Sequence, residues 1–272
     1  MYKLIKGILI LSSSLIVTIT NAQPGGGAPP PPFPSGPEII RNLDTIRRKD
    51  AGGWEFMQVR MPDHKTVYSE GSLHNGIKEG AWTTYWETGF PKTITCYTDG
   101  KKNGSYIETD PGGAIAKLIN YKNDKLEGPS RTYMSRGSMT EECYYSNGEK
   151  NGICYKYYAN RNKQQETKYV NGYPDGLATW YFESGQKMIE YSYVNGKISG
   201  NSTTYYENGK VREMGEYKDD KQTGIWKEFF ENGLERGEGM YNADGEKEGT
   251  WKQFDIEGKP TTPIKYHKGE TK

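Results

Sequence analysis

Histidine and cysteine, which commonly bind metals or act in catalysis, number three each in this 272-residue sequence. The three histidines, His64, His74 and His267, lie far apart, so nothing predicts that they meet around a metal ion. No serine, histidine and acidic residue follow the pattern of a catalytic triad, and no glycine-rich stretch has the spacing of a nucleotide-binding loop. We therefore expect no catalytic residue, no metal site and no cofactor.

The cysteines allow one specific prediction. Cys143 and Cys154 flank the turn sequence NGEK at 147–150, and they face each other on neighbouring strands if this turn is centred between residues 148 and 149. We expect two free thiols at these positions. A disulfide is the alternative, which export to an oxidising compartment would permit. Cys96 has no evident partner.

Aromatic residues make up 13% of the sequence and recur at a fixed spacing. Large rings dominate the binding energy of many protein interfaces, so a regularly spaced row of rings is a candidate binding surface. This row comprises Trp86, Tyr158, Phe182, Tyr206 and Phe230. The alternative is that these rings form the core of the protein.

The row belongs to a repeat with a period of 24 residues. Its marker is a glycine at residues 80, 104, 128, 152, 176, 200 and 224, followed after 25 residues by Gly249. With this glycine as position zero, the row occupies position six, and position seventeen is tyrosine in all eight repeats. Position nine is glycine in every repeat except one, where it is Arg161. A fixed period of this length indicates a repeat architecture.

Each repeat predicts a β-hairpin. Pairs such as Asn208-Gly209 at positions eight and nine are typical of two-residue hairpin loops, and a second series, such as Asn195-Gly196, joins successive repeats. Positions that sum to seventeen then pair, so the tyrosine at seventeen would cover the glycine at zero. Positions two, six and fifteen share this face, which we expect to be buried. The predicted fold is all-β, an elongated antiparallel meander or solenoid of about eight hairpin repeats.

Residues 1–22 have the features of a cleaved signal peptide. Two lysines precede an apolar run that is too short to span a bilayer comfortably, and small residues follow it. A linker rich in proline and glycine occupies residues 23–37. We therefore expect an exported protein of the periplasm, outer cell envelope or extracellular space, without an integral membrane span after cleavage.

Residues 38–79 are predicted to be an N-terminal cap, because a repeat sheet needs an atypical unit at its end. The apolar spacing over residues 38–50 predicts a short helix. Trp54–Met61 and Thr66–Leu73 are predicted to be two strands joined by a turn. The hairpin repeats themselves occupy residues 80–272.

The run G-x-W-x-x-Y-x-E-N-G-K, followed by a tyrosine, an N-G turn and the next glycine, covers residues 75–266 almost continuously. It resembles the MORN-repeat variant of the bacterial YwqK-family antitoxins. The resemblance implies a repeat protein that binds another protein. The antitoxin label implies a toxin partner inside the cell, which the export signal contradicts. Typical MORN repeats, which are linked to membranes and scaffolds, carry a Tyr-x-Gly-x-Trp spacing that this chain lacks.

The charge balance narrows the range of functions. The net charge is +1, from 36 basic and 35 acidic residues, so nothing indicates nucleic-acid binding or electrostatic attachment to membranes. We expect a non-enzymatic scaffold with a protein partner. The alternatives are a carbohydrate- or cell-wall-binding module, since tyrosine and tryptophan rings suit a glycan, and antitoxin-like partner binding or a membrane-associated tether.

Overall fold

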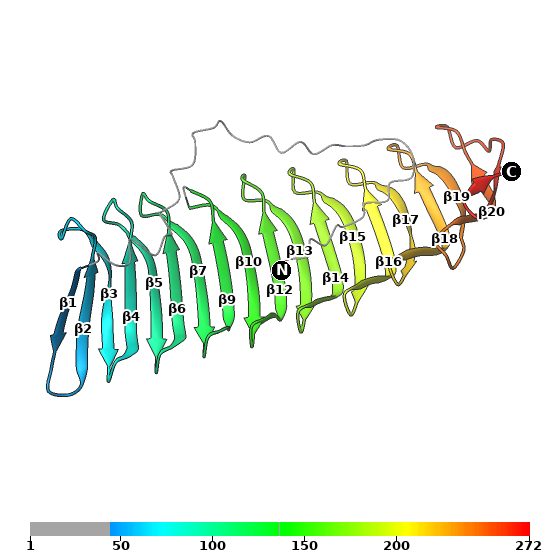
Figure 1. The fold of residues 1–272 in the computed structure, drawn as a ribbon. Helices are drawn as coiled ribbons and strands as arrows, with labels where there is room; N and C mark the ends of the chain where they lie inside the picture. Colours follow the sequence, from blue (N-terminus) through cyan, green and yellow to red (C-terminus); the bar gives the residue numbers. More distant parts are fainter. Residues whose placement is uncertain (1–43, 136) are drawn as a thin grey trace. The chain divides into compact units, whose positions relative to one another are not determined.

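The computed structural model describes residues 44–135 and 137–272. The predicted signal peptide, the linker and the start of the cap lie outside this range. The described residues contain strands and turns but no helix, and they form one open antiparallel sheet of 22 strands. Figure 1 shows the strands following one another in chain order along this sheet. The prediction of an all-β meander of hairpins is therefore confirmed.

The strands, in chain order, are β1 (Asp44–Lys49), β2 (Trp54–Arg60), β3 (Val67–His74), β4 (Ile77–Tyr85), β5 (Pro91–Thr98), β6 (Lys101–Thr109), β7 (Ile115–Lys122), β8 (Lys125–Leu126), β9 (Gly128–Tyr133), β10 (Met139–Ser146), β11 (Glu149–Lys150), β12 (Gly152–Tyr157), β13 (Lys163–Val170), β14 (Tyr173–Tyr181), β15 (Lys187–Val194), β16 (Lys197–Tyr205), β17 (Val211–Lys218), β18 (Lys221–Phe229), β19 (Glu235–Tyr241), β20 (Lys247–Gln253), β21 (Ile264–His267) and β22 (Glu270–Thr271). Two of these strands are split. β8 and β9 both pair with β7, and β11 and β12 both pair with β10.

The predicted helix is wrong for residues 44–49, which form β1. This strand pairs with β2 along its whole length, from Asp44 opposite Arg60 to Lys49 opposite Glu55. A helix of this length is marginal on its own, whereas the strand gains a full ladder of hydrogen bonds from its neighbour. The other two strands of the predicted cap are found as β2 and β3, close to their expected bounds.

Most turns that join successive repeats have the predicted two-residue form. The turn between β19 and β20 differs, because the N–H of Asn242 donates to the carbonyl of Glu246 at 2.9 Å around a three-residue loop. The turn between β15 and β16 shows the common form. Val194 pairs with Lys197, and the two loop residues Asn195 and Gly196 both have a positive φ, 50° and 84°. This is the loop geometry whose twist matches that of the flanking strands. Asparagine and glycine tolerate it best among the common residues.

The turns within the repeats are one residue longer than predicted. The backbone N–H of Tyr206 donates to the carbonyl of Lys210 at 2.8 Å, and the N–H of Gly209 donates to the carbonyl of Tyr206 at 2.9 Å. Three residues therefore form the loop, and Gly209 at φ 83° is the left-handed residue that closes it. Pairing obeys the predicted sum of seventeen up to position four and slips by one residue at position five.

The glycine at position zero is required by the backbone. Gly200 pairs with Tyr217 as predicted, but a Cβ atom at Gly80, Gly128 or Gly224 would meet no atom within 4 Å. All eight of these glycines have a positive φ. They lie in β-bulges against the preceding repeat, which only glycine enters without strain. The positive φ thus gives a backbone reason for glycine at this position, and its covering by the tyrosine ring stays a prediction.

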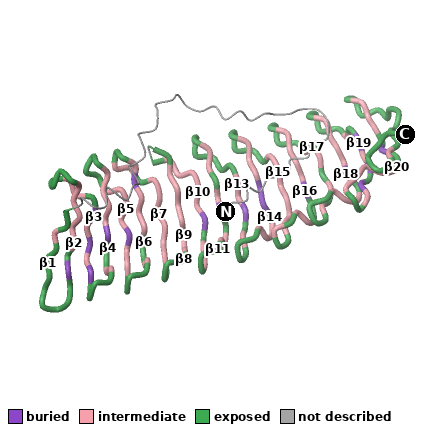
Figure 2. Tube along the Cα trace, in the orientation of Figure 1, coloured by how far each residue is buried: buried purple, intermediate pink, exposed green. Residues whose placement is uncertain are grey.

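The sheet has two different faces. Positions zero, two, four, thirteen, fifteen and seventeen lie on one face, here called the tyrosine face after its row at position seventeen. The other side, called the glutamate face, carries glutamates at position fourteen, namely Glu70, Glu142, Glu166, Glu190 and Glu238. Most buried side chains lie on the tyrosine face at positions two and fifteen, among them Trp82, Cys143, Cys154, Ala178, Ser202, Trp226 and Trp251. Figure 2 shows that the buried residues lie within the strands and that the turns are exposed.

Candidate binding surfaces

The predicted aromatic row lies at the base of the hairpin turns, and its five rings are half-buried. The hydroxyl groups of Tyr158 and Tyr206 donate to the carbonyl oxygens of Tyr181 and Phe229, at 2.7 and 2.8 Å. The indole N–H of Trp86 donates to the next repeat in the same way, at 3.2 Å. Each of these bonds ties one turn to the following repeat. The role of the row in binding a partner stays a prediction.

The hairpin turns are also linked to each other by their asparagines. The side-chain amide of Asn208 donates to the carbonyl of Glu231 at 3.0 Å, and that of Asn232 donates to the carbonyl of Ile256 at 2.8 Å. These bonds run from position eight of one repeat to position seven of the next. Each of these bonds ties one hairpin turn to the turn of the following repeat.

Rings on the C-terminal part of the tyrosine face form a continuous chain of edge-to-face contacts. Tyr217 lies 5.3 Å from Trp226, which lies 5.8 Å from Tyr241, and Tyr241 lies 5.4 Å from Trp251, all measured between ring centroids. Tyr191 and Tyr266 extend the chain at its two ends. Edge-to-face pairs stabilise each other beyond the area that they bury. These rings pack edge to face against each other and do not form a flat row on which a glycan could stack. This weakens the carbohydrate-binding alternative.

Side chains at positions fifteen and two complement each other in size at several repeat boundaries. A Cβ atom at Gly215 would lie 2.3 Å from the ring of Trp226, and one at Gly239 would lie 2.0 Å from that of Trp251. Where position two is the small Ser202, the neighbour at position fifteen is the large Tyr191. At this boundary the preceding repeat compensates for the small residue at position two, and Ser202 is buried. Ala178 faces the small Thr167, yet it is buried as well.

Cys143 and Cys154 occupy these same two positions, and they form a disulfide with Sγ atoms 2.19 Å apart, not the two free thiols expected. The joining turn is centred differently from the prediction, because Ser146 pairs with Glu149. This turn alone would shift the register of the two strands, and the bulge at Gly152 shifts it back so that Cys143 lies opposite Cys154. The two cysteines were expected to face each other, but the prediction placed the turn centre one position too late and did not include the bulge that offsets this shift.

The polar groups of the glutamate face are paired with each other. The hydroxyl of Tyr205 donates to Glu190 at 2.6 Å, and Lys187 lies 2.6 Å from the same carboxylate. Burial, and then this hydrogen bond, raise the pKa of Tyr205 to about 12. Glu142 pairs with Arg131 at 2.7 Å. These groups neutralise each other, which is typical of a structural network and gives none of them an evident catalytic task.

Three exposed apolar side chains interrupt this network in the C-terminal repeats. Met214, Ile225 and Met240 lie on the adjacent strands β17, β18 and β19 and are 43%, 64% and 48% exposed. Ile225 and Met240 are direct cross-strand partners. The ion pair between Lys227 and Glu238, 3.0 Å, flanks them. We call Met214, Ile225 and Met240 the apolar patch.

The described residues hold no group of three histidine, cysteine, aspartate or glutamate side chains that would bind a metal ion. No helix in residues 44–135 and 137–272 is long and apolar enough to cross a membrane.

Comparison with known proteins identifies the repeat. Residues 174–195 and 199–219 match the family model described as MORN repeat variant. No curated protein matches the chain. The matched residues run from β14 to β17, which are two successive hairpins of the meander. The chain therefore carries MORN-variant repeats over residues 174–219, a region that contains Met214 of the apolar patch.

Proposed function

We propose that this protein is an exported, non-enzymatic repeat scaffold that binds another protein through the glutamate face of its C-terminal repeats. The observation that carries the proposal is the apolar patch. Single exposed apolar residues are common on proteins, but contiguous ones that no element covers are typical of binding sites. In the described part of the chain, no second layer packs on this face.

The surroundings of the patch support a protein as its partner. Interfaces between proteins combine an apolar centre with a polar rim that remains accessible to water. Lys227, Glu238 and Lys252 form such a rim, with Lys–Glu distances of 3.0 and 2.8 Å. Methionine side chains adapt their shape to a partner more easily than branched ones do, and two of the three patch residues are methionines.

The proposed location outside the cytoplasm draws support from the disulfide between Cys143 and Cys154. Disulfides persist in oxidising compartments and are rare in reducing ones. The features of residues 1–22 agree with this location. An antitoxin-like role inside the cell would leave the disulfide without its usual environment.

The test is capture of partners from a cell-envelope extract on immobilised residues 23–272, followed by mass spectrometry and by affinity measurement with the purified partner. We expect one protein in near-equal amount, bound at least tenfold more weakly by the variant I225S/M240S. Leu177→Ser is the matched control, because Leu177 is 57% exposed on the same face but lies outside the patch.

Two results would contradict the proposal. Recovery of glycan fragments without a protein would favour the carbohydrate-binding alternative. Equal affinity of the partner for the wild type and for I225S/M240S would remove the apolar patch as the interface.

A further inference from the structure

One hairpin turn departs from all the others. Position nine is glycine in seven repeats, and Arg161 replaces it in the repeat that begins at Gly152. Arg161 keeps the positive φ of the glycines, 73°. Residues with a Cβ atom are disfavoured in this conformation, and they persist in it mainly where the surrounding structure or a function requires it.

Among residues 44–135 and 137–272, the side chain of Arg161 gains no polar partner in exchange. Its backbone N–H donates to the carbonyl of Tyr158 at 2.9 Å, as the turn demands. Its guanidinium forms neither an ion pair nor a hydrogen bond with any residue that the structure describes, whereas Arg131 and Arg47 pair with glutamates at 2.7 and 3.0 Å. The charge at this turn is therefore available to a ligand.

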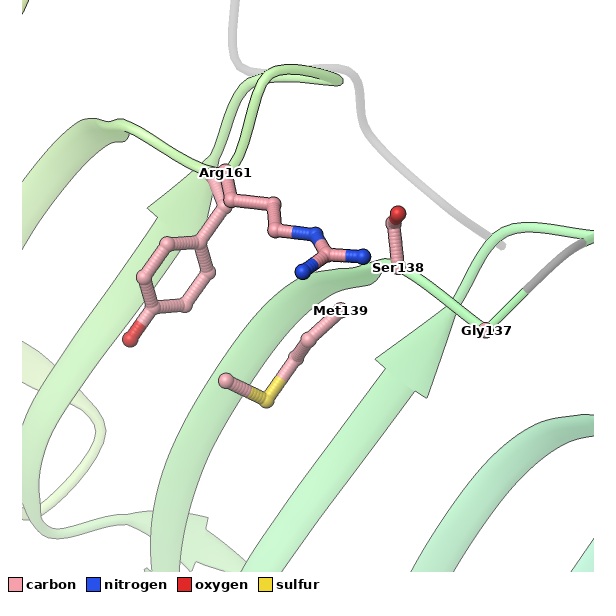
Figure 3. A pocket seen from close by; sticks show the side chains of 5 residues that line it. Gly137, Ser138, Met139 and Arg161 are labelled. Carbon is pink, nitrogen blue, oxygen red and sulfur yellow. The ribbon is translucent and has the colours of Figure 1, made fainter.

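The guanidinium lies at a pocket of about 360 Å³ lined by Gly137, Ser138, Met139, Tyr157 and Arg161. Figure 3 shows that the side chain of Arg161 reaches over Met139 towards Ser138, which belongs to the preceding repeat. The pocket thus lies between two successive hairpin turns.

Packing in other repeats explains why space is left at this turn. The residue at position ten usually covers the turn glycine of the next repeat. Phe90 lies 2.8 Å from a Cβ atom built at Gly113, and Lys210 lies 3.2 Å from one built at Gly233. Position ten is Ser138 at the pocket, and its short side chain leaves the space open into which Arg161 extends.

The lining residues indicate the chemistry of the ligand. A guanidinium presents a planar set of donors that matches a carboxylate, and the hydroxyl of Ser138 adds a further donor. The thioether of Met139 and the ring of Tyr157 supply apolar contacts beside these donors. A pocket of this volume holds a group of the size of one amino-acid residue.

We propose that this pocket binds a carboxylate carried on an apolar group, with the oxyanion on Arg161 and Ser138 and the apolar part on Met139 and Tyr157. The ligand is either a free apolar acid or the C-terminal residue of a peptide, since both present the same chemistry. The pocket is formed by β10, β12 and their turns, away from the apolar patch on β17–β19, so the two proposals are tested independently.

The test is a titration of residues 23–272 with N-acetyl-leucine and with N-acetyl-leucinamide, followed by NMR. We expect saturable shifts with the acid and none with the amide. A peptide of four residues ending in leucine separates the two sources of the ligand. Tenfold tighter binding than N-acetyl-leucine indicates a peptide terminus, and equal binding indicates a free acid.

Two variants separate a binding role of Arg161 from a structural one. Arg161→Gly restores the residue of the other repeats, so we expect a higher Tm and binding of the acid that is about tenfold weaker or more, as for a lost charge-assisted hydrogen bond. Gly209→Arg is the matched control, which places arginine in another hairpin turn and is expected to lower the Tm without creating a second site.

The proposal is overturned if the wild type binds the acid and the amide equally or not at all. It is also overturned if Arg161→Gly binds the acid as tightly as the wild type does. A lower Tm of this variant, with unchanged binding, would show that Arg161 only packs against Ser138.

Discussion

The C-terminal and the central repeats share one backbone but are held together in different ways. In β16–β21, tryptophans at position two contact the tyrosines at position seventeen, and each tryptophan faces a glycine. In β7–β13, position two holds Ser130 and Cys154, no comparable chain of rings forms among the described side chains, and a disulfide joins β10 to β12. The strands β8/β9 and β11/β12 are split in the same region.

The two regions differ at the contact between position fifteen of one repeat and position two of the next. We call this contact the joint between repeats, and it is the part of the repeat that varies. The backbone bulge recurs from repeat to repeat, and it brings these two side chains together where successive repeats meet. In the C-terminal repeats the joint consists of a tryptophan ring buried against a glycine. In the central repeats it is the disulfide between Cys143 and Cys154. The central region, which uses the covalent bond, also contains the one turn with Arg161.

Among the variants considered, removal of one aromatic ring from the C-terminal row of ring contacts is expected to lower the free energy of unfolding most. Trp226 is 2% exposed and contacts rings on both sides. Because Gly215 offers no atoms to refill the space, Trp226→Ala should lower the free energy of unfolding by about 3–5 kcal/mol. Urea denaturation followed by circular dichroism measures this change. Trp54→Ala, at a residue that is 43% exposed, serves as the control, and equal losses in the two variants would show that the ring chain does not hold the C-terminal repeats.

Loss of the disulfide should have the next largest effect and should act on the central repeats. Cys143 and Cys154 are 11 residues apart in the sequence, and closing a loop of this size contributes about 2–3 kcal/mol. C143S/C154S should lose this amount and become sensitive to proteases near residues 143–154. Cys96→Ser should change neither property. Three free thiols in the unreduced mature protein would contradict the bond itself.

A half-buried acid distinguishes the C-terminal repeats in a third way. Glu213 lies directly opposite Glu228 on the tyrosine face. Burial, with the charge of Glu228 adding to it, raises the pKa of Glu213 above its ordinary 4.5. The folded state therefore binds more protons than the unfolded state above pH 4.5, so stability falls as the pH rises through this range.

Glu213→Gln should consequently stabilise the protein at pH 7 by up to about 1 kcal/mol, as expected when a like-charge contact across two strands is removed. The gain should vanish below pH 4, where the carboxyl group is protonated in both states. Urea midpoints at the two pH values measure this. Glu216→Gln, at an exposed site on the glutamate face, should show no such difference, and a similar gain there would assign the effect to net charge.

Features determined by neighbouring residues were predictable from the sequence. The joining turn at Asn195-Gly196 was found because both residues favour the left-handed conformation that the turn requires. The hairpin turn at Asn208-Gly209 has the same letters, but only its glycine is left-handed. That difference depends on the register of the two strands, which a dipeptide does not determine.

Features determined by distant partners were missed. The apolar spacing around Ile46 suggested a helix, but β2 offered an open edge to pair with. The bulge at position zero exists only between strands, so the sequence revealed the glycine and not its reason. Arg161 was visible as an exception to the repeat, yet its pocket depends on Ser138, which is 23 residues earlier. The exposure of Ile225 and Met240 likewise required the arrangement of the strands.

The smallest change in the free energy of unfolding is expected when the disulfide of the central repeats is replaced by a glycine and a tryptophan. C143G/C154W gives the central boundary the glycine and tryptophan of the C-terminal ones, and the new indole would lie between Tyr145 and Tyr169, as Trp226 lies between Tyr217 and Tyr241. If the two chemistries are equivalent, this variant should unfold within about 1 kcal/mol of the wild type, and reductant should not change its midpoint.

The single variant C154W is the control for this exchange, because Cys143 would then stand where the ring needs a glycine. Overpacking of this kind costs about 1–3 kcal/mol, so C154W should be less stable than C143G/C154W. A double variant no more stable than C143S/C154S would mean that the split strands β8/β9 and β11/β12 cannot seat a ring. The disulfide would then be the only joint that this part of the sheet accepts, and the two regions would differ in backbone as well as in side chains.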